Sequence, residues 1–383
     1  MKVMSWAEVC ARRLERHALS APSHNARPAD IVRAMCGAHA QVMSAAELSI
    51  GLRIAGITSA AVREALWIER SLVKTRGPRG TVHLLPSEDL PMWTGALSAL
   101  PPSRNVNSKD ALLTPEQTEE VIEAITDALE KAELTVDELT DAIVERTGPW
   151  AGELVMPAFQ GMWPRWRWAE GTASNRGALC FGPNRGRKVT YTSPRRWLPG
   201  FRPGEGQAAL ASLLKSYLHS YGPATPEHFA RWLSVPSRWA TELFDALSGE
   251  LEQVEVGGSV AWVVAGDTAA PSTAPQGVHL LPYFDAYVVG CHPRELLFPG
   301  RAYERALSGG QAGNLPVLLV DGVVAGLWHQ RRSGRKLEIT VEPFGQLTPA
   351  QRRELDGQVE LVGEFLEGTP QLTIGPVTIG PHA

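Results

Sequence analysis

The sequence lacks the marks of a membrane or secreted protein. No apolar run approaches the roughly 20 residues that a membrane-spanning helix needs. The N-terminus, MKVMSWAEVCARRLERHAL, mixes acidic, basic and apolar residues at helical spacing, with no apolar segment followed by a small-residue cleavage site. It therefore does not resemble a signal peptide. We expect a cytoplasmic protein with no membrane partner, close to the nucleoid if it acts on DNA.

Cysteine is scarce and scattered. The four cysteines are Cys10, Cys36, Cys180 and Cys291, with no CxxC pair among them. That spacing argues against a zinc finger and against an iron–sulfur cluster, because both need clustered thiolates. The histidines are dispersed as well. We expect free thiols, no metal and no cofactor.

An excess of basic charge is also missing, since the net charge is −4 and the pI is about 6.2. Contacts with phosphates need basic groups, so this total counts against a nucleic-acid binder at first sight. Local charge on one face matters more than the sum, however, and several local clusters are basic. The length of 383 residues, with 44% hydrophobic and 20% charged residues, predicts a globular protein of two or three domains.

Helix starts and short strand pairs alternate along the first 270 residues. Capping boxes begin at Ser44, Thr114 and Thr135, and Thr225-Pro226 places a cap before a proline. Two or three helices followed by a hairpin is the pattern that a winged helix leaves in a sequence. The pattern occurs three times, with hairpins predicted in the following paired ranges: Leu72–Thr75 with Thr81–Leu85, Ala178–Phe181 with Val189–Thr192, and Leu251–Val256 with Val260–Val264.

After about residue 275 the pattern changes to short apolar strands. Asp321-Gly322 is a strong turn signal, and Ser333-Gly334 lies in a second, basic turn. Close spacing of short strands suggests a small barrel, with a helix over Thr348–Gly368 packed on it. The expected fold class is α+β: three tandem winged-helix motifs followed by a small C-terminal β-barrel. We predict domains at 1–110, 111–203, 204–270 and 275–383.

The segment with the clearest chemical potential is MCGAHAQVMSAAEL, residues 35–48. A helix over Ala29–Met35 is expected to stop near Gly37, and the next helix to start at Ser44. His39 and Gln41 would then lie in an extended connection, where residues two apart point the same way and Ala40 turns into the core. The two polar side chains could hold one water molecule from two sides. They could equally have structural roles, with His39 bonding a backbone carbonyl and Gln41 capping a helix.

This segment resembles the Gln-Φ-Gln and Gln-Φ-Asp segments of the AlkZ/YcaQ-type winged-helix DNA glycosylases, in a His-Φ-Gln version. Other stretches agree with that family over nearly the whole chain: RGTVHLLPSEDL, RGALCFGPNRGRKVTY, HLLPYFDAYVVG and LVDGVVAGLW. The resemblance implies that His39 and Gln41 are the catalytic pair. His39 stands where the AlkZ segment has its first Gln. This difference leaves the reaction class unchanged but leaves the preferred lesion open.

The resemblance implies a monofunctional DNA glycosylase acting on double-stranded DNA that carries alkylated guanine. A guanine alkylated at N7 is cationic and already a good leaving group, so Gln41 need only position water, with His39 as general base or second anchor. Bulky N7 adducts are favoured over methylated bases, and self-resistance to a DNA-alkylating natural product is the expected setting. The main alternative is a winged-helix transcriptional regulator without catalysis. We expect a monomer.

Basic residues near predicted turns are candidates for DNA contact. One group surrounds the C-terminal turn, and two others lie on the first and second wings. A solvated loop is an equal alternative for the C-terminal group. The candidates are Arg79, His83, Arg185, Arg187, Lys188, Arg331, Arg332, Arg335 and Lys336.

Three further interpretations are open in the sequence. His83, on a strand face opposite the apolar side, could line a cleft, and Arg76 could join Arg79 at the first wing. Asp285 is more readily a buried acceptor for backbone amides than a reacting group. The run Arg165–Trp168 could stack on nucleic acid. The favoured interpretation is structural: the tryptophans pack inward and the arginines face solvent.

Overall fold

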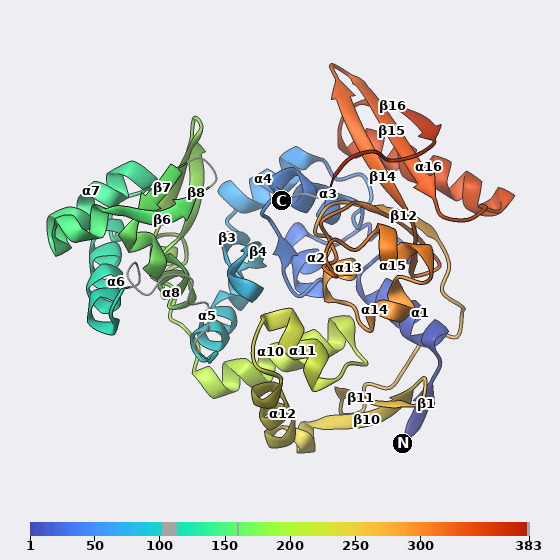
Figure 1. Cartoon of the computed structure of the whole chain (residues 1–383), viewed down its shortest axis with the longest axis horizontal. Coiled ribbons are helices and arrows are strands. Elements are labelled where there is room, and N and C mark those ends of the chain that lie inside the picture. Colours follow the sequence, from blue (N-terminus) through green and yellow to red (C-terminus); the bar gives the residue numbers. More distant parts are fainter. Residues whose placement is uncertain (102–112, 159–160, 381–383) are drawn as a thin grey trace. The chain divides into compact units, whose positions relative to one another are not determined.

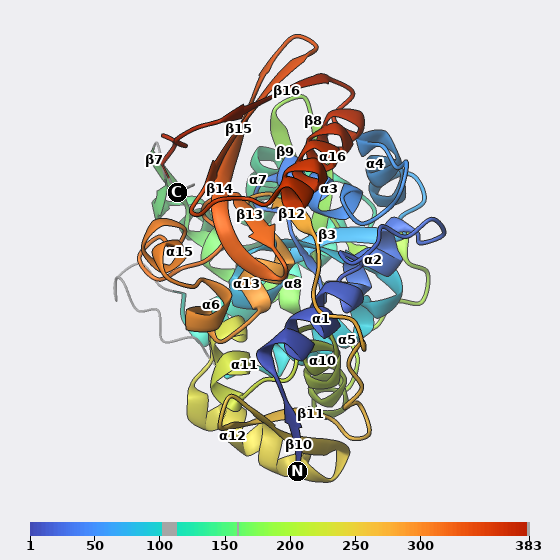
Figure 2. The same cartoon turned by 90° about the vertical axis from the view of Figure 1, so that its right-hand side faces the viewer.

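The computed structural model describes residues 1–101, 113–158 and 161–380 (Figures 1 and 2). The chain forms two compact units: unit 1 comprises Met1–Ile68 with Leu214–Ala383, and unit 2 comprises Glu69–Leu213. Both contain helices and strands, which confirms the α+β class. The predicted boundary between residues 110 and 111 lies outside the described residues. No helix in the described ranges is long and apolar enough to cross a membrane.

Unit 1 begins with a short strand and a group of helices that surround the candidate catalytic segment. Their order is β1 (Lys2–Met4), α1 (Trp6–Arg16), α2 (Pro28–Ala34), β2 (Ala38–His39), α3 (Met43–Gly51) and α4 (Ser59–Trp67). The capping box of Ser5 and Glu8 starts α1. After α2 the backbone adopts positive φ at Cys36 (52°) and Gly37 (95°), which ends the helix close to where the sequence predicted.

The predicted start of α3 is wrong. The helix begins at Met43, its N-cap is Val42, and no side chain caps it. Glu47 does not return to the helix start; its carboxylate pairs instead with the Arg63 guanidinium at 2.7 and 2.9 Å. A tertiary partner on α4 therefore outcompetes the local capping box.

The second part of unit 1 contains three helices and a hairpin. The helices are α10 (Gly206–Tyr221, which crosses from unit 2), α11 (Pro226–Leu233) and α12 (Ser237–Ala246). Strands β10 (Leu251–Val256) and β11 (Ser259–Val264) follow, joined by Gly257-Gly258 with φ of 57° and 80°. Strand β1 pairs parallel to β10, so the N-terminus lies beside this hairpin (Figure 1).

The C-terminal part of unit 1 is an open five-stranded sheet covered by one helix. Helices α13 (Ala286–Gly290), α14 (Arg294–Leu297) and α15 (Arg301–Arg305) follow its first strand. The long helix α16 (Pro349–Phe365) packs on the sheet through Leu355, Val359 and Val362. The sheet order is β12 (Val278–Leu281), β13 (Val317–Val320), β14 (Val323–Ser333), β15 (Lys336–Pro343) and β16 (Thr369–Ile374).

The predicted barrel is not found in this sheet. Its edge strands, β12 and β16, do not pair with each other in the described ranges. Strand β16, which follows the predicted terminal helix and was itself not predicted, pairs parallel to β15. The predicted turn at Asp321-Gly322 is confirmed, with φ of 50° and 82°. A parallel final strand widens the sheet and leaves it open.

Unit 2 repeats the combination of helices and hairpins. Its core is formed around the buried Ile125, Trp166 and Leu179. The hairpin β6–β7 was not predicted. The elements are β3 (Leu72–Arg76), β4 (Val82–Pro86), α5 (Leu90–Ser98), α6 (Pro115–Leu129), β5 (Leu134–Thr135), α7 (Val136–Thr147), β6 (Leu154–Ala158), β7 (Gly161–Pro164), α8 (Glu170–Asn175), β8 (Cys180–Arg185), β9 (Lys188–Thr192) and α9 (Pro194–Trp197).

Candidate active site

The predicted connection between two helices exists and carries His39 and Gln41. His39 ends the two-residue strand β2, and Gln41 lies in a bend directly before α3. Ala40 is 2% exposed, so it turns into the core as predicted. Gln41 is exposed, whereas His39 is 8% exposed. The pair therefore combines an accessible amide with a largely covered imidazole.

The His39 ring has a defined neighbour on one face and another at its Nδ1 edge. It stacks on the Phe284 ring at a centroid distance of 4.5 Å and an interplanar angle of 22°. Its Nδ1 atom lies 3.5 Å from the backbone N–H of Gln41, a long hydrogen bond. The structure thus brings the imidazole and the Gln41 residue together. A neutral imidazole that accepts this N–H at Nδ1 carries its proton on Nε2.

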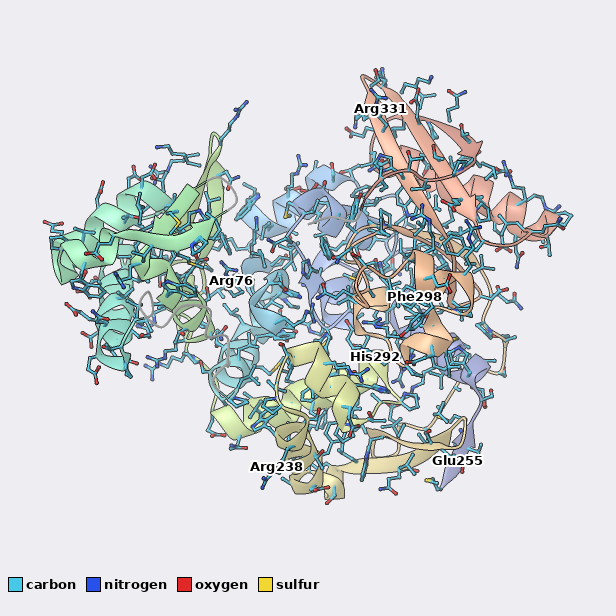
Figure 3. All side chains as sticks on the ribbon, viewed as in Figure 1. Arg76, Arg238, Glu255, His292, Phe298 and Arg331 are labelled. Atoms are coloured by element: carbon cyan, nitrogen blue, oxygen red, sulfur yellow. The ribbon has the colours of Figure 1, made fainter. Side chains whose placement is uncertain are left out.

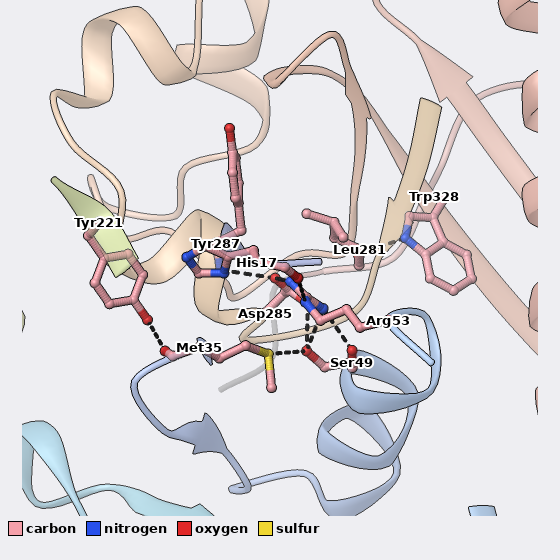
Figure 4. A network of polar contacts seen from close by, with 9 residues as sticks. All are labelled: His17, Met35, Ser49, Arg53, Tyr221, Leu281, Asp285, Tyr287 and Trp328. Atoms are coloured by element: carbon pink, nitrogen blue, oxygen red, sulfur yellow. Dashed lines mark hydrogen bonds and ion pairs between the residues drawn. The ribbon is translucent and has the colours of Figure 1, made fainter. Parts of the chain in front are cut away.

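A buried polar network holds the segment after Gln41 to the segment that carries Phe284 (Figure 4). Asp285 accepts hydrogen bonds from Ser49 Oγ at 2.6 Å and from two nitrogens of Arg53 at 2.8 and 2.9 Å. It also accepts the Tyr287 amide at 3.0 Å and thereby caps α13. Ser49 lies on α3 and Arg53 just after it. The helix that follows the candidate site is therefore anchored to the loop of Phe284.

The start of the candidate segment is anchored as well. The buried Tyr221 hydroxyl donates to the Met35 carbonyl at 2.5 Å, and the Met35 sulfur lies 3.6 Å from Ser49 Oγ (Figure 4). Arg53 also donates to the His17 carbonyl at 2.8 Å. Because both ends are held by buried polar contacts, residues 36–42 have little freedom to move independently.

The charge state of Asp285 follows from this network. Burial by itself would raise the pKa of the carboxyl group, but the Arg53 charge and the hydrogen bonds from Arg53, Ser49 and the Tyr287 amide hold it below its usual value. The side chains of Arg53 and Asp285 are both fully buried. The favoured interpretation of Asp285 from the sequence, a buried structural acceptor, agrees with these contacts, and the ion pair adds to it.

Ser49, Arg53, Tyr221 and Phe284 were missed as members of the site. The LPYFD stretch was marked in the sequence, but no local pattern connects Arg53 with Asp285, 232 positions away. Ser49 and Arg53 are four apart on one helical face, which is a weak signal for a shared partner. The partner itself becomes visible only in the fold.

The basic residues of the β8–β9 hairpin, the predicted second wing, are partly neutralised. Arg185 donates to both Glu138 oxygens at 3.1 and 2.8 Å, and Lys188 pairs with Asp137 at 2.7 Å. Both pairs are exposed to solvent, as is Arg187. Phosphate oxygens would therefore have to compete with two acidic residues of α7 for Arg185 and Lys188.

The basic hairpin of unit 1 presents its charges differently. Arg331, Arg332, Arg335 and Lys336 are exposed around the β14–β15 turn, and Figure 3 shows Arg331 near its outer end. Arg332 donates to backbone carbonyls, and Lys336 pairs with Glu338 at 3.1 Å. In the described ranges, no ion pair involves Arg331 or Arg335. The charges of Arg331 and Arg335 can therefore meet a phosphate without first breaking an ion pair of the described residues.

The β3–β4 hairpin, the predicted first wing, agrees less well with the predicted DNA contacts. Arg79 lies in the turn before β4 with a φ of 60° and is partly exposed. His83 is only 4% exposed, and its Nδ1 lies 2.9 Å from the Thr81 carbonyl. The prediction that His83 faces an accessible cleft from its strand is therefore wrong. Arg76 pairs with the buried Glu170 at 2.5 Å and is thereby held to the core of unit 2.

In the run Arg165–Trp168, Trp166 packs inward, as the structural interpretation predicted. Trp166 is buried and donates its indole N–H to Thr140 at 2.9 Å. The predicted solvated arginines are wrong: Arg165 pairs with Glu153 at 2.7 Å and Arg167 with Glu170 at 2.9 Å, and their side chains are only 17% and 14% exposed. These contacts stabilise unit 2 and leave no sign of a stacking platform in this run.

Comparison with known proteins agrees with this arrangement. The family model described as "DNA glycosylase AlkZ-like" matches residues 32–365, which include the His39–Gln41 segment, α3 and the Asp285 loop. The chain belongs to the AlkZ-like DNA glycosylase family. It is 35% identical over 356 residues to the "Interstrand DNA cross-link repair glycosylase" of Streptomyces sahachiroi, covering 89% of this chain and 91% of that protein.

A solved structure supports the same assignment at the level of the fold. Streptomyces sahachiroi DNA glycosylase AlkZ superposes with a TM-score of 0.81 and 28% identity, over 98% of this chain and 100% of that one. The protein is thus a DNA glycosylase, and the alternative of a transcriptional regulator without catalysis is set aside.

Proposed function

We propose that this glycosylase hydrolyses the N-glycosidic bond of bulky N7-alkylguanine adducts in double-stranded DNA, with Gln41 and His39 as its catalytic pair. The observation that carries the proposal is the segment between α2 and α3. It presents an exposed amide beside an imidazole and is held at both ends by buried polar contacts. A preorganised polar pair can orient water without reorganising during the reaction.

A bulky lesion fits the position of Gln41. The side chain is exposed rather than enclosed, and a large or cross-linked guanine does not readily enter the tight pocket that receives most flipped bases. The relative from Streptomyces sahachiroi is named for interstrand cross-link repair, which is the same class of obstacle. Self-resistance to a DNA-alkylating natural product is the setting that we infer for such an activity.

The chemistry requires little acid catalysis. In an N7-alkylated guanine the purine is cationic, and the electron pair of the C1′–N9 bond neutralises it as it leaves. Gln41 positions a water molecule whose oxygen forms the new bond to C1′ of the oxocarbenium-like sugar. The proton of that water passes to solvent after the bond has formed. The Nδ1 contact of His39 favours an Nε2–H that donates to the water, which supports the role of second anchor.

The element order supports a tandem winged-helix architecture. We propose one motif from α2, α3, α4 and the β3–β4 hairpin, and one from α6, α7, α8 and β8–β9. The third consists of α10, α11, α12 and β10–β11. The domains predicted at 1–110, 111–203, 204–270 and 275–383 remain proposals, as does a monomeric protein.

Replacing Gln41 with Ala tests the catalytic assignment. If Gln41 positions the attacking water, the single-turnover rate of base release should fall at least about 100-fold. Gln253→Ala is the matched control, because Gln253 is an exposed glutamine on β10, outside the candidate site. Near-normal release by the Gln41 variant, at equal folded protein, would exclude Gln41 from the reaction.

The substrate is tested with two duplexes that differ only in the lesion. Purified protein should release a bulky N7-guanine adduct faster than 7-methylguanine, and the abasic strand should stay intact until it is treated with alkali. Preferential release of 7-methylguanine would contradict the bulky-lesion proposal. Improved survival of a sensitive bacterium that expresses the protein, under the alkylating natural product, would support self-resistance.

A further inference from the structure

Phe284 has an unusual backbone conformation for its residue type. Its φ is +57°, and it is the one aromatic residue with positive φ in the described ranges. A bulky side chain avoids this region because its Cβ approaches the backbone too closely. Such strain persists only where the surroundings fix it, and it is concentrated at functional sites.

The surroundings fix Phe284 from both sides along the chain. Its amide donates to the Gly313 carbonyl at 2.8 Å. The next residue, Asp285, is fully buried and bonded to Ser49 and Arg53. Gly313 has φ of +98°, and an added Cβ would lie 2.7 Å from the Val289 side chain and 3.2 Å from the Phe284 Cα, so the position favours glycine. Tertiary contacts thus hold Phe284 in a backbone conformation that phenylalanine intrinsically disfavours.

In this backbone conformation, the Phe284 ring stacks on His39. The 4.5 Å separation and 22° angle place one imidazole face against Phe284. The long hydrogen bond between Nδ1 and the Gln41 amide then defines the rotation of the ring within its plane. Together these interactions specify where the imidazole edge points. An imidazole without them could not hold a fixed water molecule with Gln41.

We propose that Phe284 is a positioning residue that fixes the plane of the His39 ring, and that the Arg53–Asp285 pair with Ser49 holds Phe284 in place. The inference rests on the proposed function, since it gives His39 a role in hydrolysis. It adds a structural link, because α3 starts at Met43, two residues after Gln41. Ser49, near the far end of α3, is bonded to Asp285, the neighbour of Phe284 in the chain (Figure 4). The two catalytic side chains are therefore set by one helix.

Phe284→Leu and Phe284→Tyr test this proposal together. Leucine retains apolar bulk but removes the stack, so the single-turnover release rate should fall roughly 10-fold, with DNA affinity nearly unchanged. Tyrosine keeps the ring and should restore most of the rate. Phe244→Leu is the control, because Phe244 on α12 packs against Phe229 and Trp262; it is fully buried, whereas Phe284 is only partly buried. The control should leave the rate of the folded protein unchanged.

The orientation of the ring itself is measured by NMR of histidine-labelled protein, with the His39 signal assigned through His39→Ala. Stacking on an aromatic face shifts the imidazole proton resonances upfield. Phe284→Leu should abolish that shift and Phe284→Tyr should retain it. If the leucine variant does not fold, Ser49→Ala is the milder test, because it removes the 2.6 Å hydrogen bond to Asp285 and the longer contacts of Ser49 Oγ with Arg53 and Met35 but keeps the Arg53–Asp285 pair. It should produce a smaller change in both readouts.

The outcomes separate this inference from the proposed function. Full activity of His39→Ala, with the ring shift still dependent on Phe284, would overturn the catalytic role of His39 and leave the stacking intact. A wild-type rate in Phe284→Leu, or an unchanged His39 resonance, would overturn the positioning role while Gln41 and His39 could still be required.

Discussion

Two arginine–carboxylate pairs in this protein have almost the same geometry and opposite environments. Arg53 and Asp285 are joined by two hydrogen bonds of 2.8 and 2.9 Å, and both side chains are 0% exposed. Arg185 and Glu138 are joined by bonds of 3.1 and 2.8 Å, with side chains 47% and 48% exposed. Solvent, and not bond geometry, decides what each pair can do.

The buried pair is a fixed structural element, whereas the exposed pair can exchange partners. Removing charge from water is costly, so each buried charge depends on the other and on the bonds from Ser49 and Tyr287. Water screens the exposed pair, which contributes little to stability and can release Arg185 to a phosphate. The first pair therefore suits positioning, and the second suits reversible DNA binding.

The largest expected effect comes from breaking the buried pair. Arg53→Met leaves the Asp285 charge buried without its partner and should destabilise the protein by about 3–5 kcal/mol, measured by urea unfolding. The double variant Arg53→Met with Asp285→Leu should recover much of this stability, because no charge is left buried. An Arg53→Met protein as stable as the wild type would mean that solvent reaches the pair.

Acid should weaken the buried region before it affects the exposed pairs. Burial lowers the pKa of His17 to about 3 and of His279 to about 4, against an ordinary 6.5. The unfolded chain takes up these protons near pH 6.5 but the folded chain does not, so stability is full above pH 6.5 and falls as the pH drops toward 4. Each histidine should contribute a slope of up to about 1.4 kcal/mol per pH unit in that window.

A single variant separates this effect from general acid sensitivity. His279→Gln should flatten the pH dependence of the free energy of unfolding between pH 6.5 and 4 by nearly one proton. Asp285 contributes only at the acidic end of that window, because the unfolded carboxyl group begins to bind a proton below about pH 5, whereas the folded one, with its lowered pKa, binds it at a more acidic pH. An unchanged slope in His279→Gln would show that this histidine is protonated in the folded state.

The smallest expected effects concern the exposed charges. Replacing Arg331, Arg332, Arg335 and Lys336 with Gln should weaken DNA binding and reduce the slope of log affinity against log salt by about 0.9 for each phosphate that is no longer neutralised. Arg185→Ala with Lys188→Ala should reduce the slope less, because Glu138 and Asp137 already compete for these charges. Equal slopes for the hairpin variant and the wild type would remove the hairpin from the interface.

The same contrast explains how far the sequence could predict the molecule. Helix starts such as Thr114, Thr135 and Thr348 were predictable, because their capping boxes are local. The predicted start at Ser44 was wrong because Glu47 pairs with Arg63 on α4 instead of capping α3. The β10 and β11 hairpin was predictable from Gly257-Gly258, whereas β16 follows a helix and pairs through a long connection.

The candidate site was predictable in part. His39 and Gln41 stood out because a helix end and a helix start bracket them, and because the segment resembles a known family. Phe284 could not be assigned to His39, since a stack across 245 positions depends on the path of the chain between them. Local signals specify local structure, and buried long-range pairs specify how the site is held.

The most direct test of the central claim is a double-mutant cycle on His39→Ala and Gln41→Ala, measured as single-turnover release of a bulky N7-guanine adduct. If both side chains hold one water molecule, the double variant should be no slower than the slower single variant, because either substitution already frees the water. Rate reductions that multiply in the double variant would mean that the two residues act independently and would contradict the account.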